Sequence, residues 1–323
     1  MARQSALRLV GTRGLDRERW LEVRKQGIGS SDAAAAVGLN PYKSSLALWM
    51  EKTGRTINAD ISSDMESPAY WGTLLEPFVA EAYATKTGRR VRRVNSVLQH
   101  PTYAFMLANL DREIVGSPEA QILECKTAGE FGSRLWRDGV PEYVQLQVQH
   151  QLAVTGKEAA DVAVLLCGQK LEIFRVVRDE DVIARLVVLE ARFWDHVERD
   201  TPPPADGTES SARALRDLYP GGTSTLDFSD DARLCQTFSD LVALREQLEA
   251  QGNEAELLRQ ILQEAMGDAS RAVFAAGEVT FKRSKDGTRL DSKQLAKDHP
   301  DLVARYTVLR PGTRRFVIDA GPV

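Results

Sequence analysis

The stretch QILECKTAG, residues 121–129, places an acid and a base two positions apart in an otherwise apolar run. If this run is a β-strand, successive side chains point to opposite faces, so Glu124 and Lys126 lie on one face and Cys125 on the other. We therefore expect one face of the strand to belong to the core and the other to form a site.

The segments before this strand predict further strands. Residues 89–99 and 103–115 have strand composition, and a turn follows at residues 116–118. Together with residues 120–128 they predict a three-stranded meander.

The segments after the strand predict a helix, a hairpin and a second helix. Residues 141–156 form a helix that begins at a proline and ends at a glycine. Residues 161–178 form a hairpin, and a helix follows over residues 179–200. The order β-β-β-α-β-β-α predicts an α/β fold with a mixed β-sheet flanked by helices.

Four helices are expected before the meander. They are residues 17–26 with Asp16 as N-cap, a short alanine-rich helix capped by Ser30 or Ser31, residues 44–54 and residues 71–87. In the last of these, Leu75, Phe78, Val79 and Ala82 follow helical spacing and predict the buried stripe, with Glu76 beside it.

Composition places the chain among ordinary globular proteins. Its 323 residues are 43% hydrophobic and 27% charged, and the formal net charge is −4. This charge gives no overall attraction to nucleic acid, so a DNA-binding surface must be a local patch. Cys125, Cys167 and Cys235 lie far apart, which favours reduced thiols over a disulfide framework or a metal-binding cluster. No segment has the pattern of a signal peptide or a membrane span, and we expect a cytoplasmic protein.

Three regions are expected along the chain. They are a core over residues 1–200, a linker over residues 201–224 and a C-terminal extension over residues 225–323. The linker prediction rests on the proline-rich stretch DTPPPADGTESSA, which begins at Asp200.

The C-terminal extension is expected to be mainly helical. Apolar residues from 234 to 262 predict a long helix, or a helical hairpin broken near residues 252–253. Short strands at residues 278–284 and 314–319 are expected around a small helix that begins near Asp291. Whether the extension packs on the core, mediates oligomerisation or receives a partner stays open.

The charged pair gains a neighbour from the preceding strand. Asp111 lies thirteen residues before Glu124, and a hairpin-like arrangement brings the two carboxylates close, since adjacent strands lie about 4.8 Å apart. Two carboxylates that both stay ionised at neutral pH need a cation between them, and Mg²⁺ or Mn²⁺ suits oxygen ligands. With Lys126 to orient the nucleophile or offset developing charge, such a site fits phosphodiester hydrolysis.

A less specific interpretation is also available for these residues. Glu124 and Lys126 could form a solvated pair on a strand surface, since acids and bases at this spacing occur by chance in many proteins. Three features favour a site instead: the apolar strand, the position of Asp111, and flanking helices that carry Glu76 and Gln147.

Several motifs in this order resemble the PD-(D/E)xK nuclease superfamily and, within it, the YqaJ-type viral recombinases related to phage lambda exonuclease. The motifs are RKQGIGSSDAAAAVGLNPY (24–42), WGTLLEPFVAEAY (71–83), LANLDREIV (107–115), LECKTAG (123–129) and PEYVQLQVQHQLAVTG (141–156). The segment HPDLVARYTVLRPGTRRFVI (299–318) is similar to C-terminal segments of these proteins. The resemblance implies a restriction-endonuclease-like core.

The resemblance also implies roles for the matching residues. The implied metal ligands are Asp111, Glu124, Glu76 and the backbone carbonyl of Cys125, the catalytic set includes Lys126 and Gln147, and the 5′-phosphate contacts are Arg24 and Ser31. From the residues alone, Ser31 reads as a helix cap and Arg24 as a surface residue. One departure is visible, because the family often has a glycine soon after the strand aspartate, where this chain has Arg112 and Glu113.

The implied activity is that of a two-metal, ATP-independent exonuclease. It digests one strand of linear double-stranded DNA from the 5′ end and leaves a 3′ single strand, alongside a phage single-strand annealing protein in the bacterial cytoplasm. The resemblance also implies a homotrimeric ring, in which a basic lumen is compatible with an acidic net charge. The best lumen or backbone contacts are Arg89, Arg90, Arg92 and Arg93, which can equally be solvated surface residues.

Two other interpretations stay open. One is an endonuclease or single-strand nuclease of the same superfamily, although a single-strand form with a cysteine-bound iron–sulfur cluster requires clustered cysteines, which the chain lacks. The other is a catalytically inactive DNA-binding scaffold. Such a scaffold has no physical need to keep two carboxylates facing each other.

Overall fold

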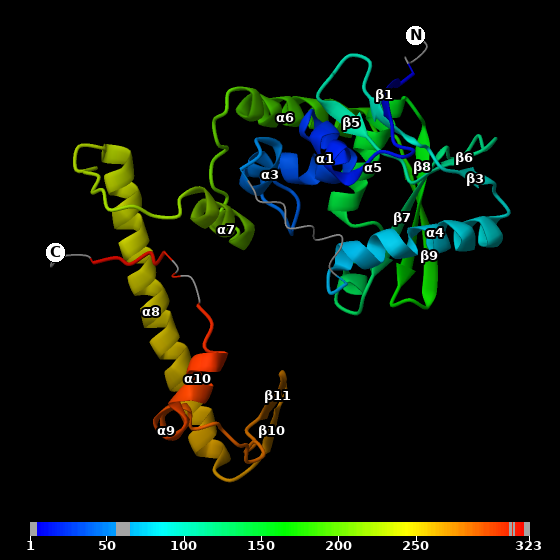
Figure 1. The fold of residues 1–323 in the computed structure, drawn as a ribbon. Helices are drawn as coiled ribbons and strands as arrows, with labels where there is room; N and C mark the ends of the chain where they lie inside the picture. The colour runs from blue at the N-terminus through cyan, green and yellow to red at the C-terminus, as the bar shows by residue number, and fades with distance from the viewer. Residues whose placement is uncertain (1–4, 56–64, 310–311, 313, 320–323) are drawn as a thin grey trace. The chain divides into compact units, whose positions relative to one another are not determined.

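The computed structural model describes residues 5–55, 65–309, 312 and 314–319. The chain forms two compact units, Met1–Pro220 and Gly221–Val323 (Figure 1). No helix in the described part of the chain is long and apolar enough to cross a membrane.

The first unit is built on a five-stranded mixed sheet with the order β3-β6-β7-β8-β9. Its strands are β3 (Val91–Arg92), β6 (Arg112–Ile114), β7 (Ile122–Ala128), β8 (Ala159–Leu166) and β9 (Lys170–Val177). Strands β7 and β8 are parallel, and the other neighbours are antiparallel. The predicted mixed sheet and the hairpin of β8 and β9 are confirmed.

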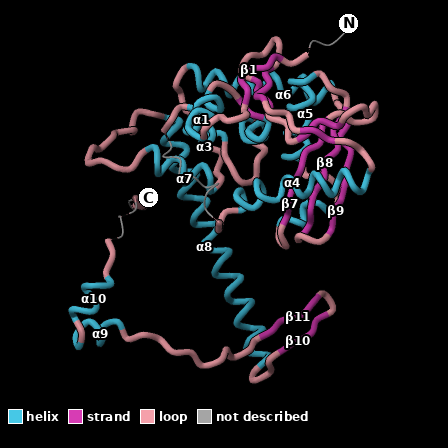
Figure 2. The backbone as a smooth tube through the Cα atoms, turned by 45° about the vertical axis from the view of Figure 1, so that its right-hand side comes forward, coloured by secondary structure: helices cyan, strands magenta, loops and turns pink. Residues whose placement is uncertain are grey.

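Helices cover both faces of this sheet. Helix α4 (Pro68–Thr87) packs its Tyr83 against Leu123 on one face, and Figure 2 shows it running across β7 and β9. Helix α5 (Glu142–Thr155) packs on the other face, where Val148 meets Ile122. The face of β7 that carries Glu124 and Lys126 is therefore core at Ile122, and the rest of this face is where the predicted site can lie.

A second, four-stranded sheet has the order β1-β4-β5-β2. Its strands are β1 (Leu7–Gly11), β2 (Ile28–Gly29), β4 (Ser96–Gln99) and β5 (Met106–Ala108). The predicted three-stranded meander is wrong, because the segments 89–99 and 103–115 each divide between the two sheets. Composition does not distinguish one long hairpin from two short ones stacked end to end, so this division escaped the sequence pattern.

The remaining helices of the first unit surround these sheets. They are α1 (Arg17–Lys25), the 3₁₀ turn η1 (Ser30–Asp32), α2 (Ala33–Ala36), α3 (Ser45–Lys52), the 3₁₀ turn η2 (Gly132–Trp136), α6 (Glu180–Glu198) and α7 (Glu209–Leu218). Asp16 caps α1 as predicted. The predicted cap of α2 by Ser30 or Ser31 is wrong, since both serines lie within η1 and no side chain caps α2.

Helix α4 turns a different stripe toward the sheet than the sequence pattern predicted. Val79, Ala80 and Tyr83 are buried, whereas Phe78 is 61% exposed. The sequence pattern predicted the wrong buried stripe because α4 itself carries apolar side chains on several of its sides. With the true stripe, Glu76 lies one turn before Val79 and Ala80 and therefore faces the sheet side.

The predicted linker contains a helix that packs on the core. Helix α7 lies within residues 201–224, and Ser210 Oγ accepts a hydrogen bond from the backbone N–H of Ser44 at 2.9 Å. Ala214 is buried in the cluster that includes Trp49 of α3. The first unit thus extends to Pro220, because the proline-rich stretch ends before an amphipathic helix begins.

The second unit contains one long helix and several short elements. They are α8 (Ala232–Met266), β10 (Arg271–Phe274), β11 (Gly277–Thr280), α9 (Ser292–Asp298) and α10 (Pro300–Tyr306). Helix α8 continues through Gly252, since a glycine inside a helix costs only about 1 kcal/mol. The predicted strand at 314–319 is absent, and β11 pairs with β10 instead.

Candidate active site

The site lies where β7 extends beyond its neighbour β6. Strand β6 pairs with β7 only through Arg112↔Leu123 and Glu113↔Ile122. Asp111 directly precedes β6, and its Oδ2 accepts a hydrogen bond from the backbone N–H of Cys125 at 2.8 Å. Because the N–H and C=O of one strand residue point to the same edge, the carbonyl of Cys125 also faces Asp111.

Glu124 is buried among donors from β7 and α5. Its Oε1 accepts from Gln147 Nε2 at 2.6 Å and pairs with Lys126 Nζ at 2.7 Å, and its Oε2 accepts from Gln151 Nε2 at 2.7 Å. Lys126 also donates to Gln147 Oε1 at 2.9 Å. The acid, the base and Gln147 therefore form one closed hydrogen-bonded set, which Gln151 supports from the next helical turn.

Glu76 reaches the same region from α4 but has a cationic partner. Its Oε1 pairs with Arg112 Nη1 at 2.5 Å, and Arg112 is itself buried. Arg112 also donates to the backbone carbonyl of Asp111 at 2.5 Å. Arg112, which stands where the family often has a glycine, therefore contacts both Glu76 and Asp111, two of the predicted metal ligands.

The site has more negative than positive charge. Burial raises the pKa of Asp111 well above its usual range, and the charges of Glu124 and Glu76 raise it further. Burial opposes the charge of Lys126, but Glu124 and Asp111 outweigh it and raise the pKa of the ammonium. Burial also raises the pKa of the Cys125 thiol, which makes this cysteine a poor nucleophile.

The oxygen donors of this site fit a hard divalent cation. The described residues contain no group of three or more His, Cys, Asp and Glu side chains arranged to hold a metal. Two carboxylates, Asp111 and Glu124, and the Cys125 carbonyl nevertheless provide oxygen donors that Mg²⁺ or Mn²⁺ takes together with water. A cation would also offset the charge that raises the pKa of Asp111. Glu76 would have to leave Arg112 in part to act as a further ligand.

A cleft of about 700 Å³ connects this set with the N-terminal motif. At one side it is lined by Asp111, Glu124 and Lys126, and at another by Arg24 and Ser31. The lining is completed by residues that include Glu76, Gln147, Tyr143, Asn109 and Trp20. Residues from all five of these predicted motifs therefore open onto one space.

Arg24 is held in the cleft by an acid that the sequence analysis did not identify. Its Nη2 lies 2.8 Å and 2.9 Å from the two carboxylate oxygens of Asp32, and 3.4 Å from Ser31 Oγ. Asp32 is buried and also pairs with Lys52 Nζ at 2.8 Å. Burial opposes the charge of Asp32, but Arg24 and Lys52 outweigh it and lower the pKa of this carboxyl far below its usual range.

Two further residues of the site were missed. Gln151 follows Gln147 by one helical turn, and this i, i+4 spacing was the signal that could have identified it. Asp32 follows Ser31 directly and carried no comparable signal. His150 of helix α5 is not part of the site, since it is buried and its Nδ1 pairs with Glu190 at 2.7 Å inside the core.

The arginine cluster lies elsewhere. None of Arg89, Arg90, Arg92 and Arg93 lines the cleft. Arg89 pairs with Asp161 at 2.5 Å and with Glu119, and Arg92 pairs with Glu113 at 2.6 Å. A contact between these arginines and DNA stays a prediction.

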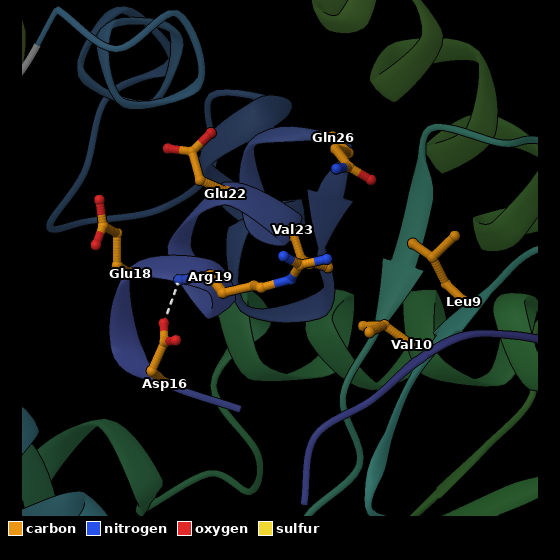
Figure 3. A pocket seen from close by; sticks show the side chains of 8 residues that line it. All are labelled: Leu9, Val10, Asp16, Glu18, Arg19, Glu22, Val23 and Gln26. Atoms are coloured by element: carbon orange, nitrogen blue, oxygen red, sulfur yellow. Dashed lines mark hydrogen bonds between the residues drawn. The ribbon is translucent and has the colours of Figure 1, made fainter. Parts of the chain in front are cut away.

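Another cleft, of about 540 Å³, lies beside α1 and β1 (Figure 3). It is lined by Asp16, Glu18, Glu22, Arg19 and apolar residues that include Leu9. The carboxylate of Asp16 accepts from the backbone N–H of Arg19 at 2.8 Å, as expected for a helix cap. None of the predicted site residues lines this cleft.

Comparison with known proteins gives three similarities. The family model for the YqaJ-like viral recombinase domain matches residues 19–158. The uncharacterized protein YqaJ of Bacillus subtilis strain 168 is 34% identical over 310 residues, which cover 94% of each chain. An alkaline exonuclease from Laribacter hongkongensis superimposes with a TM-score of 0.47 at 22% identity, over 62% of this chain and 100% of that one. For a phage-related exonuclease from Haemophilus somnus 129PT the TM-score is 0.37 at 11% identity, over 56% and 99% of the two chains.

Proposed function

Because the chain belongs to the family of YqaJ-like viral recombinases, we propose that it is a nuclease that hydrolyses DNA phosphodiester bonds at Asp111 and Glu124. The observation that carries this proposal is the closed set of Glu124, Lys126 and Gln147 next to Asp111 at the free edge of β7. A solvated strand surface would not bury Glu124 or supply it with three donors.

The side chains at this edge have distinct tasks in the proposed reaction. A bound Mg²⁺ or Mn²⁺ would polarise a phosphoryl oxygen and lower the pKa of a water molecule. The ammonium of Lys126 has three N–H donors, of which Glu124 and Gln147 engage two. The third can orient the attacking water or contact a phosphoryl oxygen, and the raised pKa of Lys126 keeps it charged. Gln147 and Gln151 hold the Glu124 carboxylate in place.

The direction of cutting is proposed from the other side of the cleft. Arg24 is 31% exposed, and only its Nη2 contacts Asp32 and Ser31. A guanidinium has five N–H donors, so Arg24 retains donors for a terminal phosphate. An end phosphate held there places the adjacent chain in the cleft that Asp111 lines. This supports an exonuclease that begins at a phosphorylated 5′ end and leaves a 3′ overhang.

Further features of the proposal rest on family membership. They are the use of linear double-stranded DNA, independence from ATP, two metal ions per site, a homotrimeric ring and cooperation with a phage single-strand annealing protein. An endonuclease would need no binding site for an end phosphate. The effect of Arg24 on the preference for phosphorylated 5′ ends therefore distinguishes an exonuclease from an endonuclease.

The test is digestion of 5′-phosphorylated linear duplex DNA with Mg²⁺ and without nucleotide. We expect the wild-type protein to shorten one strand, and EDTA or Asp111→Asn to abolish this. Covalently closed circular DNA should stay intact, and its cleavage would identify an endonuclease. If wild type leaves linear DNA uncut with either Mg²⁺ or Mn²⁺, the nuclease proposal is wrong.

A further inference from the structure

Helix α8 exposes apolar side chains along its length. It spans 35 residues, which corresponds to about 52 Å, and none of its side chains is buried. Leu244, Leu248 and Leu258 are 52%, 59% and 57% exposed. Hydrogen bonds and packing within the described part of the second unit leave these leucines at the surface, so the helix retains an apolar face for another helix.

The apolar side chains follow a coiled-coil repeat. One heptad frame places Leu241 at position a and Leu244 at position d. Of the seven possible frames, it is the one that keeps every Asp, Glu, Arg and Lys of α8 out of positions a and d. The a positions are Leu234, Leu241, Leu248, Ala255 and Leu262, and the d positions are Thr237, Leu244, Gln251, Leu258 and Ala265. The repeat continues through the whole helix, with the polar side chains of Thr237 and Gln251 at two of its d positions.

The a and d positions together form a largely apolar seam along α8. The charged residues at the neighbouring e and g positions determine which partner helix fits this seam. In a parallel pair of identical helices, each g residue faces the e residue five positions later on the partner helix. This places Asp240 against Arg245 and Glu254 against Arg259, and it places the apolar Ile261 against Met266. No like charges face each other in this arrangement. An antiparallel pair brings e positions together instead, so arginine faces arginine.

We propose that α8 forms a parallel coiled coil with α8 of another copy of this chain. The leucines and alanines at positions a and d supply the apolar contact, and the g–e pairs supply both partner choice and direction. The proposal is independent of the nuclease chemistry, because no residue of the cleft takes part. It assigns a role in self-assembly to the C-terminal extension.

Two neighbouring leucines provide a matched test in the full-length chain. Leu258 lies in the seam and Leu257 lies outside it, and both are 57% exposed. We expect sedimentation velocity to show self-association of wild type and of Leu257→Asp. Leu258→Asp should raise the dissociation constant by about tenfold or more, equivalent to about 1.4 kcal/mol. Circular dichroism should show that both variants fold.

Charge reversal tests the direction of the pair. Asp240 and Arg245 are five positions apart and do not face each other within one helix. Arg245→Glu should therefore weaken self-association, and Asp240→Arg combined with Arg245→Glu should restore it. The proposal is overturned if wild type is monomeric, if the two leucine variants behave alike, or if Arg245→Glu strengthens the assembly as an antiparallel pair requires.

Discussion

The Asp111 carboxylate accepts a hydrogen bond from the backbone N–H of Cys125 at 2.8 Å. The bond joins the residue before β6 to the part of β7 that β6 does not reach. Since Cys125 directly follows Glu124, the same bond sets the distance between the two carboxylates. The geometry of the proposed metal site is thus determined by backbone that the sheet holds rigid.

Removing the charge of either carboxylate should abolish cleavage without unfolding the chain. Asp111→Asn retains an oxygen that can accept from Cys125, and Glu124→Gln retains the shape of the side chain. We expect the rate of DNA hydrolysis to fall at least about a hundredfold, because each carboxylate is proposed to supply a ligand charge worth several kcal/mol to the transition state. Gel shift in Ca²⁺ should show unchanged DNA binding. Substantial activity in both variants would contradict the proposed site.

Gln151 is expected to position Glu124 rather than to contact DNA. Gln151→Leu removes the 2.7 Å bond to Glu124 Oε2. Loss of such an outer partner typically costs about 10–100-fold in metal affinity or activity, and the Mg²⁺ concentration for half-maximal activity should rise accordingly. Gln149→Leu is the matched control, since Gln149 is a buried residue of the same helix that donates to Val177 instead. Equal metal dependence in the two variants would show that Gln151 has no positioning role.

Arg24 should control the preference for phosphorylated ends. Arg24→Ala removes charge-assisted hydrogen bonds to an end phosphate, and we expect the rate ratio of 5′-phosphate to 5′-hydroxyl duplex to fall about tenfold or more. Arg19→Ala removes the same charge from the same helix, but Arg19 lines the other cleft (Figure 3), so this variant should keep the ratio. An unchanged ratio in Arg24→Ala would contradict the phosphate seat.

The stability of the first unit should decrease above neutral pH through His150. Burial opposes its charged form, but Glu190 outweighs burial and raises the pKa of His150. A raised folded pKa contributes stability that is complete below the unfolded pKa of about 6.5 and is lost as pH rises through the folded pKa. Urea unfolding from acidic to alkaline pH should show this decline. Glu190→Gln should remove it, and an identical decline in that variant would show that other groups are responsible.

Motifs made of neighbouring residues could be interpreted before the structure was known. Glu124 and Lys126 share a strand, and Asp111 lies on the other side of the turn that precedes this strand. Local spacing was therefore enough to predict that the three side chains lie close together. Gln147 followed from its place in an ordered set of motifs. Their proximity is confirmed, and their catalytic roles stay predictions.

Contacts that depend on packing could not be predicted in this way. Arg112 was noticed only as a departure from the family pattern, yet it pairs with Glu76. Lys52 and Asp32, twenty positions apart, determine how Arg24 is held. Which side of α4 faces the sheet was predicted wrongly, because apolar residues on several sides of a helix do not identify its buried stripe.

The sequence by itself determined most strand and helix types of the first unit, the helix ends at Asp16, Gly88 and Gly156, and the order of the site motifs. These features depend on interactions within a few residues. Only the tertiary structure decided that β7 is covered on both faces, that the meander divides between two sheets and that Arg24 and Asp111 open onto one cleft. Those outcomes depend on which surfaces exclude water from each other, and that choice is made by the whole folded chain.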